Sequence, residues 1–599
     1  MSSAKVVNDF SITIGTVNGS GSQTANVTLL RALFKMGIPV SGKNLFPSNI
    51  QGLPTWYTIR VSKDGFIARR DEVEVVVELN AASFQRDLDS VVPGGAFFYA
   101  DDIKLPITRA DIAVYPMPIK ALAKAAQVSP NLRDYIANMV YVGVLAQSLG
   151  IDMDKIRQAL DFHFKGKAAA IDSNMAVIQS GFDWAAQNIH KSDPYSVASM
   201  DATSGYIMTD GNTAAALGAV YGGVQFAAWY PITPATSLAE ALNVYLPQLR
   251  KTADGKNTYA VLQAEDELAA IGMAVGAGWG GLRAMTSTSG PGISLMSEYA
   301  GLAYHTEVPV VIWDVQRVGP STGMPTRTAQ GDLTETYFLS HGDTQNVILL
   351  PGSVQECFEF GWKAFDLAER LQMPVFVLSD LDLGMNQWMT SPFEYPDAPL
   401  DRGKILWEKD LEKLNGSWAR YRDVDGDGIP YRTVPGNRHP ASSYFARGTG
   451  HDEFTRYSED AATWEHNMDR IKQKYETART LVPSAVIEKS RGATIGIIAF
   501  GSTEAAVHEA RALLKKEHGL AIDFMRLRAL PCTQEAFDFV KKHERLYVVE
   551  ANRDGQLRQI LSMVVPPDQT PKLRSVCHSD GLPLTARWVM KTLLEQEKK

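Results

Sequence analysis

The chain has 599 residues, 45% of them hydrophobic and 21% charged, a composition typical of a soluble globular protein with about three or four domains. A formal net charge of −8 leaves no basic excess to neutralise phosphates, so nucleic acid is not expected as a partner. The three cysteines are far apart and form no Cys-x-x-Cys pair. This argues against a disulfide framework and against an iron–sulfur cluster held by this chain alone.

Membrane insertion and secretion are not expected either. No apolar stretch approaches the roughly 18 residues of a membrane span. Lys5, Asn8 and Asp9 lie where a secretory signal would need an apolar run. We therefore expect a cytoplasmic protein.

The first predicted unit is a strand, a glycine-rich turn and a helix, over residues 10–14, 15–22 and 23–36. Free amides at a helix amino terminus can bind phosphate, so this unit is a possible anion site. The dinucleotide-binding fingerprint is not satisfied, because Thr24 occupies its third glycine position counted from Gly19. Phosphate binding and a plain tight turn both remain open.

Further strands and helices alternate along the next part of the chain. We predict strands over residues 55–62, 73–79 and 95–100, and a helix over residues 131–150. Alternation of this kind indicates a parallel α/β sheet. Residues 182–203 are polar and are predicted to be a linker.

The next domain, predicted over residues 204–400, contains a glutamate followed by small residues. Ala270, Ala274 and Gly276 follow Glu267 by three, seven and nine positions. On a helix, the two alanines share the side of Glu267, whereas Gly276 faces away and could admit a neighbour. A flat heterocycle could lie against this face with the carboxylate at its edge nitrogen. The alternative is a packed helix with a solvated glutamate.

A buried strand over residues 308–315 ends just before Arg317 and a turn-rich loop that extends to residue 328. Ligands of open α/β sheets lie beyond the carboxyl ends of strands. Arg317 has the fork geometry to bind a carboxylate, and Thr233 and Thr326 could each donate a hydroxyl. The alternatives are a surface ion pair for Arg317 and a satisfied turn for Thr233.

Three motifs in this region occur in one order. They are Tyr230-Pro231-Ile232-Thr233-Pro234, then Thr286-Ser287-Thr288-Ser289-Gly290-Pro291-Gly292, then Val311 to Arg317 with Gly319-Pro320-Ser321-Thr322-Gly323 and Pro325-Thr326. With the Glu-x-x-Ala-x-x-x-Ala-x-Gly spacing between the first two, they resemble the pyrimidine-type domain of thiamine diphosphate-dependent 2-oxoacid:ferredoxin (or flavodoxin) oxidoreductases. The chain most resembles the fused gamma–alpha subunit of the 2-oxoglutarate branch.

The resemblance implies roles for these residues. Glu267 would bond the cofactor's pyrimidine ring and favour the tautomer that removes the proton from the reactive carbon. Arg317, Thr233 and Thr326 would orient the 2-oxoacid, with Glu267, Arg317 and Thr233 as the catalytic residues. The implied cofactor-binding residues are Tyr230, Pro231, Ile232, Glu267, Ser289 and Gly290.

Residues 1–195 resemble the gamma-type domain of the same enzymes, in the first glycine turn and in residues 46–54. This implies coenzyme A contacts from Ser20, Gly21 and Asn26. Many relatives have a richer glycine turn near residue 19, and Arg-Gly-Gly where this chain has Gln51-Gly52-Leu53.

Residues 401–489 resemble an extended connecting segment of alpha subunits, and residues 490–599 resemble a transketolase C-terminal domain, to which we assign no chemistry. Asp423, Asp425 and Asp427 imitate the start of an EF-hand loop, but its twelfth position is Val434 instead of Glu. Gly426-Asp427-Gly428 imitates a thiamine diphosphate–magnesium motif, but residues 438–466 lack the required Asn. We therefore predict no metal site on this chain.

The resemblance also implies an assembly. Thiamine diphosphate would be shared with a beta subunit that carries Mg²⁺ and a [4Fe–4S] cluster, in a dimer of heterodimers that passes electrons to ferredoxin or flavodoxin. The expected fold is a multidomain α/β chain with gamma-type, pyrimidine-type and transketolase C-terminal-like parts.

The expected reaction is the coenzyme A-dependent oxidative decarboxylation of 2-oxoglutarate to succinyl-CoA, with possible reversal to fix CO₂. Pyruvate or a branched-chain 2-oxoacid is the alternative substrate. A non-catalytic binding subunit with the thiamine fold and a transketolase-like enzyme without redox chemistry also stay open.

Overall fold

The computed structural model describes residues 5–48, 52–126, 133 and 135–598, which form two compact units. Unit 1 comprises Met1–Met208, Asn386–Pro392 and Leu584–Trp588, and unit 2 comprises Thr209–Met385, Phe393–Pro583 and Val589–Lys599. The finer division into four domains stays a prediction. Gln51 and the start of the helix predicted over residues 131–150 lie outside the described residues.

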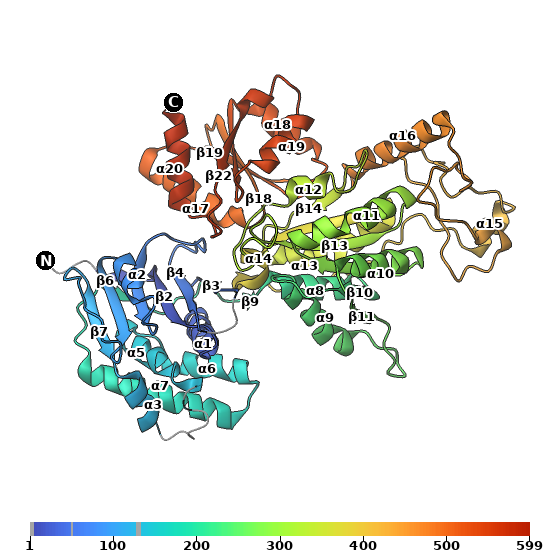
Figure 1. Ribbon diagram of the computed structural model, residues 1–599. Coiled ribbons are helices and arrows are strands. Elements are labelled where there is room, and N and C mark those ends of the chain that lie inside the picture. Colours follow the sequence, from blue (N-terminus) through green and yellow to red (C-terminus); the bar gives the residue numbers. More distant parts are fainter. Residues whose placement is uncertain (1–4, 49–51, 127–132, 134, 599) are drawn as a thin grey trace. The chain divides into compact units, whose positions relative to one another are not determined.

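Unit 1 contains a six-stranded sheet (Figure 1). In spatial order its strands are β3 Val40–Leu45, β4 Pro54–Ser62, β2 Asp9–Val17, β5 Val73–Glu78, β6 Val91–Ala100 and β7 Ala113–Met117. The sheet is mixed, because β4 runs antiparallel to both β2 and β3. The parallel sheet expected from the sequence is therefore antiparallel at this edge. Only residues 46–53 separate β3 from β4 in the sequence, whereas a parallel pair would need a longer crossover connection.

Each face of this sheet is covered by helices of unit 1. The larger core joins one face to α1 and α5, and a smaller core joins Val76 and Phe97 on the other face to Phe84 and Leu88 of α2. The helices are α1 Ser22–Lys35, α2 Phe84–Ser90, α3 Ile119–Ala125, α5 Met139–Leu149, α6 Met153–Phe164 and α7 Ala168–Asn188. Because α7 continues to Asn188, the first part of the predicted linker 182–203 is helical.

Unit 2 is built on a seven-stranded sheet. Its spatial order is β11 Ala260–Gln263, β10 Phe226–Trp229, β12 Ala284–Thr288, β13 Val310–Gln316, β15 Pro374–Asp380, β14 Val347–Leu349 and β20 Ala529–Leu530. All these pairs are parallel except β14 with β20. The antiparallel edge strand β20 comes from the C-terminal region, so this sheet extends beyond the predicted 204–400 domain.

The helices of the first half of unit 2 surround this sheet. They are α8 Gly211–Tyr221, α9 Thr236–Leu249, α10 Glu267–Trp279, α11 Gly290–Thr306, α12 Leu333–Tyr337, α13 Val354–Leu371 and α14 Leu381–Met385. Every residue of β13 and β15 is buried, as expected for central strands with helices on both faces.

The C-terminal part of unit 2 has a sheet of its own, with four parallel strands and one antiparallel edge strand. Its order is β17 Val486–Glu488, β19 Ile522–Leu527, β18 Ile495–Phe500, β21 Arg545–Glu550 and β22 Leu573–Cys577. Its helices are α17 Glu504–His518, α18 Gln534–Lys542, α19 Gln556–Val564 and most of α20 Ala586–Glu597, whose first three residues belong to unit 1.

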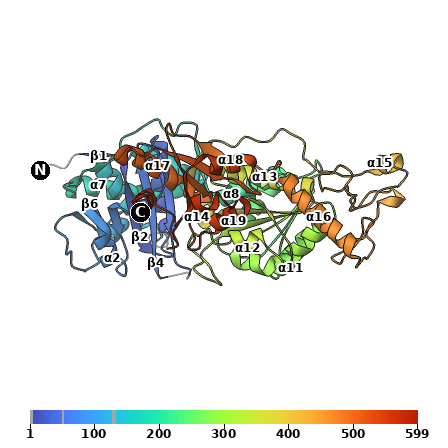
Figure 2. The same cartoon turned by 90° about the horizontal axis from the view of Figure 1, so that it is seen from above.

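Residues 401–482 contain little regular structure and extend away from the seven-stranded sheet as an arm (Figures 1 and 2). The arm contains α15 Glu408–Lys413 and α16 Ala461–Ala478. Glu307, just after α11, anchors α16, because its carboxylate pairs with Arg470 at 2.5 Å and with Lys474 at 2.6 Å in the interior.

The remaining strands are short. They are β1 Val6–Val7, β8 Tyr195–Ser196, β9 Ile207–Thr209 and β16 Trp388–Thr390.

No helix within the described part of the chain combines the length and the apolar character needed to cross a bilayer.

Candidate active site at the carboxyl ends of the second sheet

The predicted site residues of unit 2 follow four adjacent parallel strands. Glu267 comes after β11, Tyr230 after β10, Ser289 after β12 and Arg317 after β13. Carboxyl ends of parallel strands meet at one edge of a sheet, which is where open α/β sheets bind ligands. The fold therefore brings these four segments together.

Glu267 is the first residue of α10 and is only 7% exposed. Asp266 caps this helix, its side chain accepting the Ala269 N–H at 2.7 Å. Among the described residues, none donates a hydrogen bond to the Glu267 carboxylate. A buried carboxylate without a donor is costly, so this group fits a ligand that supplies an N–H or a protonated ring nitrogen.

An open face on α10 was expected, against which a flat heterocycle could lie. The small residues that follow Glu267 do not form one. Ala270 and Ala274 are fully buried, and Ala270 packs in a core cluster with Ala228 of β10. This side of α10 contacts the sheet, so the alternative of a packed helix is correct for the two alanines. Gly276 does face away, and a Cβ there would meet no atom within 4 Å.

The amino end of α11 lies against Glu267. A Cβ added to Gly292 would lie 2.9 Å from Cγ of Glu267 and 1.9 Å from Oγ1 of Thr288, so only glycine allows this approach. Ser289 precedes α11, is fully buried, and its hydroxyl has no partner among the described residues. Because buried polar groups are normally hydrogen-bonded, a buried hydroxyl without a partner is a second group that fits a polar ligand.

Arg317 joins two loops at the edge of the sheet. Its Nη1 donates to the Thr233 carbonyl at 2.7 Å and its Nη2 to the Thr322 carbonyl at 3.3 Å, and the residue is 7% exposed. Burial lowers the pKa of Arg317, while the negative charges of Asp332 and Glu267 oppose this effect. A surface ion pair, the alternative expected for Arg317, is therefore not what the structure contains.

The remaining predicted residues line the same edge with different exposure. Tyr230 and Pro231 are exposed, Ile232 and Thr233 are half-buried, and Gly290 lies in the first turn of α11. The Thr326 side chain is buried and its Oγ1 accepts from Arg327 at 3.0 Å. The Thr326 hydroxyl is thus oriented by a neighbouring cation.

Two acidic residues of this site were not identified from the sequence. Asp314 of β13 is fully buried, and neither of its carboxyl oxygens has a hydrogen-bond partner among the described residues. The nearby charges of Asp332 and Glu335 further disfavour its ionised form. Burial raises the pKa of Asp332 to about 7 and that of Asp314 well above its usual range. A Cβ on Gly290 would lie 2.7 Å from Oδ1 of Asp332, which places this pair at the amino end of α11.

One feature of the sequence could have identified Asp314. It is the only charged residue of a strand that is otherwise apolar apart from its terminal glutamine, and buried charges are rare unless paired. Asp332 follows a loop, where acidic residues are common, so its burial carried no comparable signal.

In unit 1, the residues predicted to contact coenzyme A lie at the turn before α1. Gly21 is exposed and Ser20 half-buried, and α1 has neither a side-chain cap nor an acidic residue in its first turn. Asn26 is different, because it is buried and its Oδ1 accepts the Tyr141 hydroxyl at 2.7 Å. Asn26 thus lies in the interior of unit 1, and its coenzyme A contact stays a prediction.

The acidic loop that imitates metal-binding motifs is occupied by internal bonds. Asp423 accepts backbone N–H groups of its own loop, and Lys404 pairs with Asp425 at 2.6 Å and with Asp427 at 2.8 Å. Within the described residues, no group of three or more His, Cys, Asp or Glu side chains could hold a metal ion.

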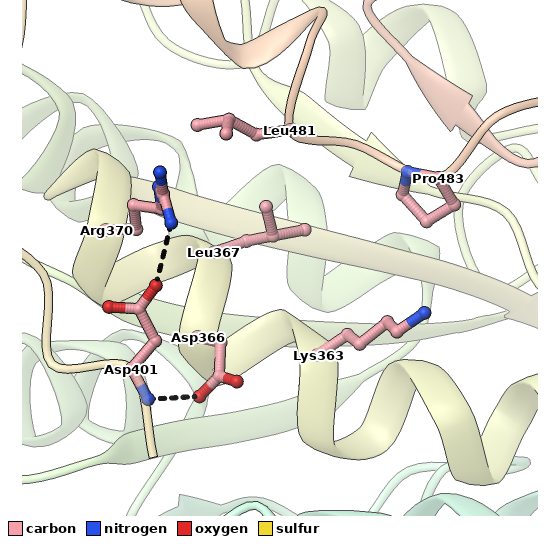
Figure 3. Close-up of a pocket in the computed structure, with 7 residues that line it drawn as sticks. All are labelled: Lys363, Asp366, Leu367, Arg370, Asp401, Leu481 and Pro483. Atoms are coloured by element: carbon pink, nitrogen blue, oxygen red, sulfur yellow. Dashed lines mark hydrogen bonds and ion pairs between the residues drawn. The ribbon is translucent and has the colours of Figure 1, made fainter. Parts of the chain in front are cut away.

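Two cavities of unit 2 lie away from the predicted residues. One, of about 220 Å³, is lined mainly by α13, with Arg370 bonded to Asp401 and the Asp401 N–H bonded to Asp366 (Figure 3). The other, of about 660 Å³, lies in the arm beside Trp418 and Tyr431. Neither is lined by a predicted site residue, so neither belongs to the site at the sheet edge.

Comparisons with known proteins agree with this geometry. Residues 217–401 match the family model described as pyruvate flavodoxin/ferredoxin oxidoreductase, thiamine diP-binding. This range includes every predicted site residue of unit 2. Residues 11–184 match the model described as pyruvate ferredoxin/flavodoxin oxidoreductase. The fold and the site thus define a thiamine diphosphate-binding α/β protein.

Full-length relatives define the family more closely. The chain is 30% identical to 2-oxoacid:ferredoxin oxidoreductase 2, subunit alpha, of Aeropyrum pernix, with 96% of each chain covered. It is 35% identical to the 2-oxoglutarate synthase subunit KorA of Methanothermobacter marburgensis, over 61% of this chain and 94% of that one.

A solved structure is similar over the whole length. It is 2-oxoglutarate:ferredoxin oxidoreductase from Magnetococcus marinus with 2-oxoglutarate, coenzyme A and succinyl-CoA bound, at a TM-score of 0.86 and 28% identity, covering 99% of this chain and 100% of that one. The chain belongs to the 2-oxoacid:ferredoxin oxidoreductase family, as an alpha subunit. The predicted family and α/β fold class are therefore confirmed.

Proposed function

We propose that this chain is the alpha subunit of an enzyme that oxidises 2-oxoglutarate and coenzyme A to succinyl-CoA and CO₂, with reduction of ferredoxin or flavodoxin. The same sites would serve the reverse reaction, which fixes CO₂. The choice of 2-oxoglutarate is supported by the relatives named for this substrate and by the full-length structure that contains it.

The buried carboxylate of Glu267 carries this proposal. It has no hydrogen-bond donor among the described residues and lies beside the glycine-lined start of α11, so it fits the edge of a thiamine pyrimidine ring. When bound, thiamine diphosphate supplies the carbon nucleophile and the electron sink of the reaction. The Glu267 carboxylate would accept a hydrogen bond from the protonated ring nitrogen. The hydroxyl of Ser289, which has no partner among the described residues, would donate to the same ligand.

The substrate would bind at the carboxyl end of β13. Arg317 has a buried Nε without a partner among the described residues, and it already orients the turn that carries Thr233. With Thr326, these residues would orient the 2-oxoacid head group. Buried donors with fixed positions bind such a group at low entropic cost.

The helices beside Glu267 support the proposal of a partner subunit. On α10, Leu268 and Met273 are 38% and 42% exposed, and on α11, Leu295 and Tyr299 are 46% and 39% exposed. Apolar side chains gathered beside a site mark an interaction surface. We assign this surface to a beta subunit that would hold the diphosphate, Mg²⁺ and a [4Fe–4S] cluster, in a dimer of heterodimers.

Coenzyme A is assigned to the turn before α1. Free amides at the amino end of this helix suit a phosphate group, and Ser20, Gly21 and Asn26 are the predicted contacts.

A coupled assay tests the proposed function. The chain, purified with its partner subunit, is given coenzyme A, ferredoxin and in turn 2-oxoglutarate, pyruvate and a branched-chain 2-oxoacid. We expect ferredoxin reduction with the highest kcat/KM for 2-oxoglutarate. A higher value for another 2-oxoacid would reassign the substrate, and no reduction with any of them would favour a non-catalytic subunit.

A further inference from the structure

The C-terminal sheet of unit 2, for which no chemistry was predicted, is bonded directly to the loop over residues 326–332. This loop begins with Thr326 of the proposed substrate site and ends with Asp332 of the buried acid pair. The Thr328 N–H donates to the Gly581 carbonyl at 3.1 Å, and the Asp332 N–H donates to Oε1 of Gln316 on β13 at 3.1 Å. The loop thus connects the two sheets.

Gln330 forms most of the hydrogen bonds between the loop and the C-terminal sheet, and it is only 1% exposed. Its Nε2 donates to the carbonyl of Phe500, at the end of β18, at 2.8 Å, and its Oε1 accepts the Ala551 N–H, just after β21, at 2.9 Å. Its backbone N–H donates to the Ala551 carbonyl at 2.8 Å, and its carbonyl accepts from Asn552 at 3.0 Å. Every polar group of this residue is therefore bonded to the carboxyl edge of the C-terminal sheet.

Gln556, the first residue of α19, bonds the end of the loop in the same way. Its Oε1 accepts the Thr334 N–H at 2.9 Å, and its Nε2 donates to the Gly331 carbonyl at 2.6 Å. Two amide side chains from different elements thus fix the backbone on both sides of Gly331. Such a network specifies one loop position, because shifting the loop would leave several buried polar groups unpaired.

We propose that Gln330 is a positioning residue through which the C-terminal domain sets the place of Thr326 and Asp332 against Arg317. The inference rests on the proposed function, because it assigns the loop to the 2-oxoacid side of that site. The hydrogen bonds of Gln330 all go to the C-terminal sheet, whereas Cγ of Glu267 lies beside Gly292 of α11. Loosening the loop is therefore expected to impair substrate orientation and to leave the thiamine pyrimidine contact intact.

The test compares Gln330→Leu with Asn467→Leu in the complex with the partner subunit. Asn467 is a matched control, because its amide is buried in the arm and bonded to the His451 carbonyl, far from the loop in the sequence. For Gln330→Leu we expect kcat/KM for the 2-oxoacid to fall roughly 10- to 100-fold, since small misplacements of positioning groups have effects of this size. The thiamine diphosphate concentration for half-saturation should change less than about twofold.

Hydrogen exchange gives a readout that does not need activity. In Gln330→Leu, amides over residues 328–334 should exchange faster than in the wild type, and they should be unchanged in Asn467→Leu. Gln556→Leu, at a half-buried position, should reproduce both effects, and the double variant should be less than additive because both residues fix the same loop. If Gln330→Leu fails to fold, the single variant at Gln556 provides the test.

The proposal would be overturned by equal losses of kcat/KM in Gln330→Leu and Asn467→Leu, by a parallel rise in the thiamine diphosphate requirement, or by unchanged exchange of the loop. A wild-type complex that oxidises no 2-oxoacid would instead contradict the proposed function, and the exchange measurements would still decide whether Gln330 positions the loop.

Discussion

Replacing Glu267 with glutamine removes the carboxylate charge but keeps the size and shape of the side chain. The packing against Gly292 is retained, so no cavity forms. Glu267 also lies in the first turn of α10, where losing a negative charge costs roughly 0.3–1 kcal/mol of helix stabilisation. We therefore expect the free energy of unfolding to fall by no more than about 1 kcal/mol.

The expected effect on the reaction is much larger. A positioned group that handles a proton contributes about 10²- to 10⁴-fold, so kcat should fall by that factor, which corresponds to about 3–5 kcal/mol of barrier. The assay is ferredoxin reduction by the complex at saturating thiamine diphosphate. Glu265→Gln is the matched control, because Glu265 is exposed and lies two residues before Glu267. If Glu267→Gln kept wild-type turnover, the assigned role of this carboxylate would be refuted.

Three further predictions concern neighbouring residues. Gly292→Ala should displace Glu267 and lower kcat/KM at least tenfold, because the new Cβ would lie 2.9 Å from Cγ of Glu267 and 1.9 Å from Oγ1 of Thr288. Unchanged kinetics would contradict this close approach. Gly276→Trp should leave the melting temperature of the free chain nearly unchanged but weaken partner binding in a pull-down titration, and equal binding would exclude Gly276 from the interface. The pKa of Asp332 is raised by burial from 3.8 to about 7, so the native chain holds a proton that the unfolded chain releases, and the unfolding free energy falls as pH rises between these values. Asp332→Asn should flatten this fall in urea titrations between pH 5 and 7, and a parallel curve would show that another group causes it.

The parts of the site that follow strand ends could be predicted from the sequence, because each lies in a local motif. Strand β13 and Arg317 illustrate this, since a continuous apolar run followed by a polar loop defines both the strand and the edge where it ends. The buried position of Glu267 also agreed with the motif spacing, although the two alanines after it pack against the sheet instead of a ligand.

Contacts between residues distant in sequence could not be predicted. Gln330 bonds Phe500 and Ala551, more than a hundred residues away, and no local pattern distinguishes it from an exposed glutamine. The mixed sheet of unit 1 and the strand β20 were missed for the same reason, since strand pairing depends on tertiary context more than on local propensity.

The central claim is that one carboxylate of this chain contacts the pyrimidine ring of thiamine diphosphate while another chain holds the diphosphate end. A structure of the complex with thiamine diphosphate and Mg²⁺ tests this most directly. We predict an oxygen of Glu267 within about 2.6–3.2 Å of a ring nitrogen, with Mg²⁺ and the diphosphate bound by the partner subunit. A ring bound elsewhere, or Mg²⁺ and diphosphate held by this chain alone, would contradict the account.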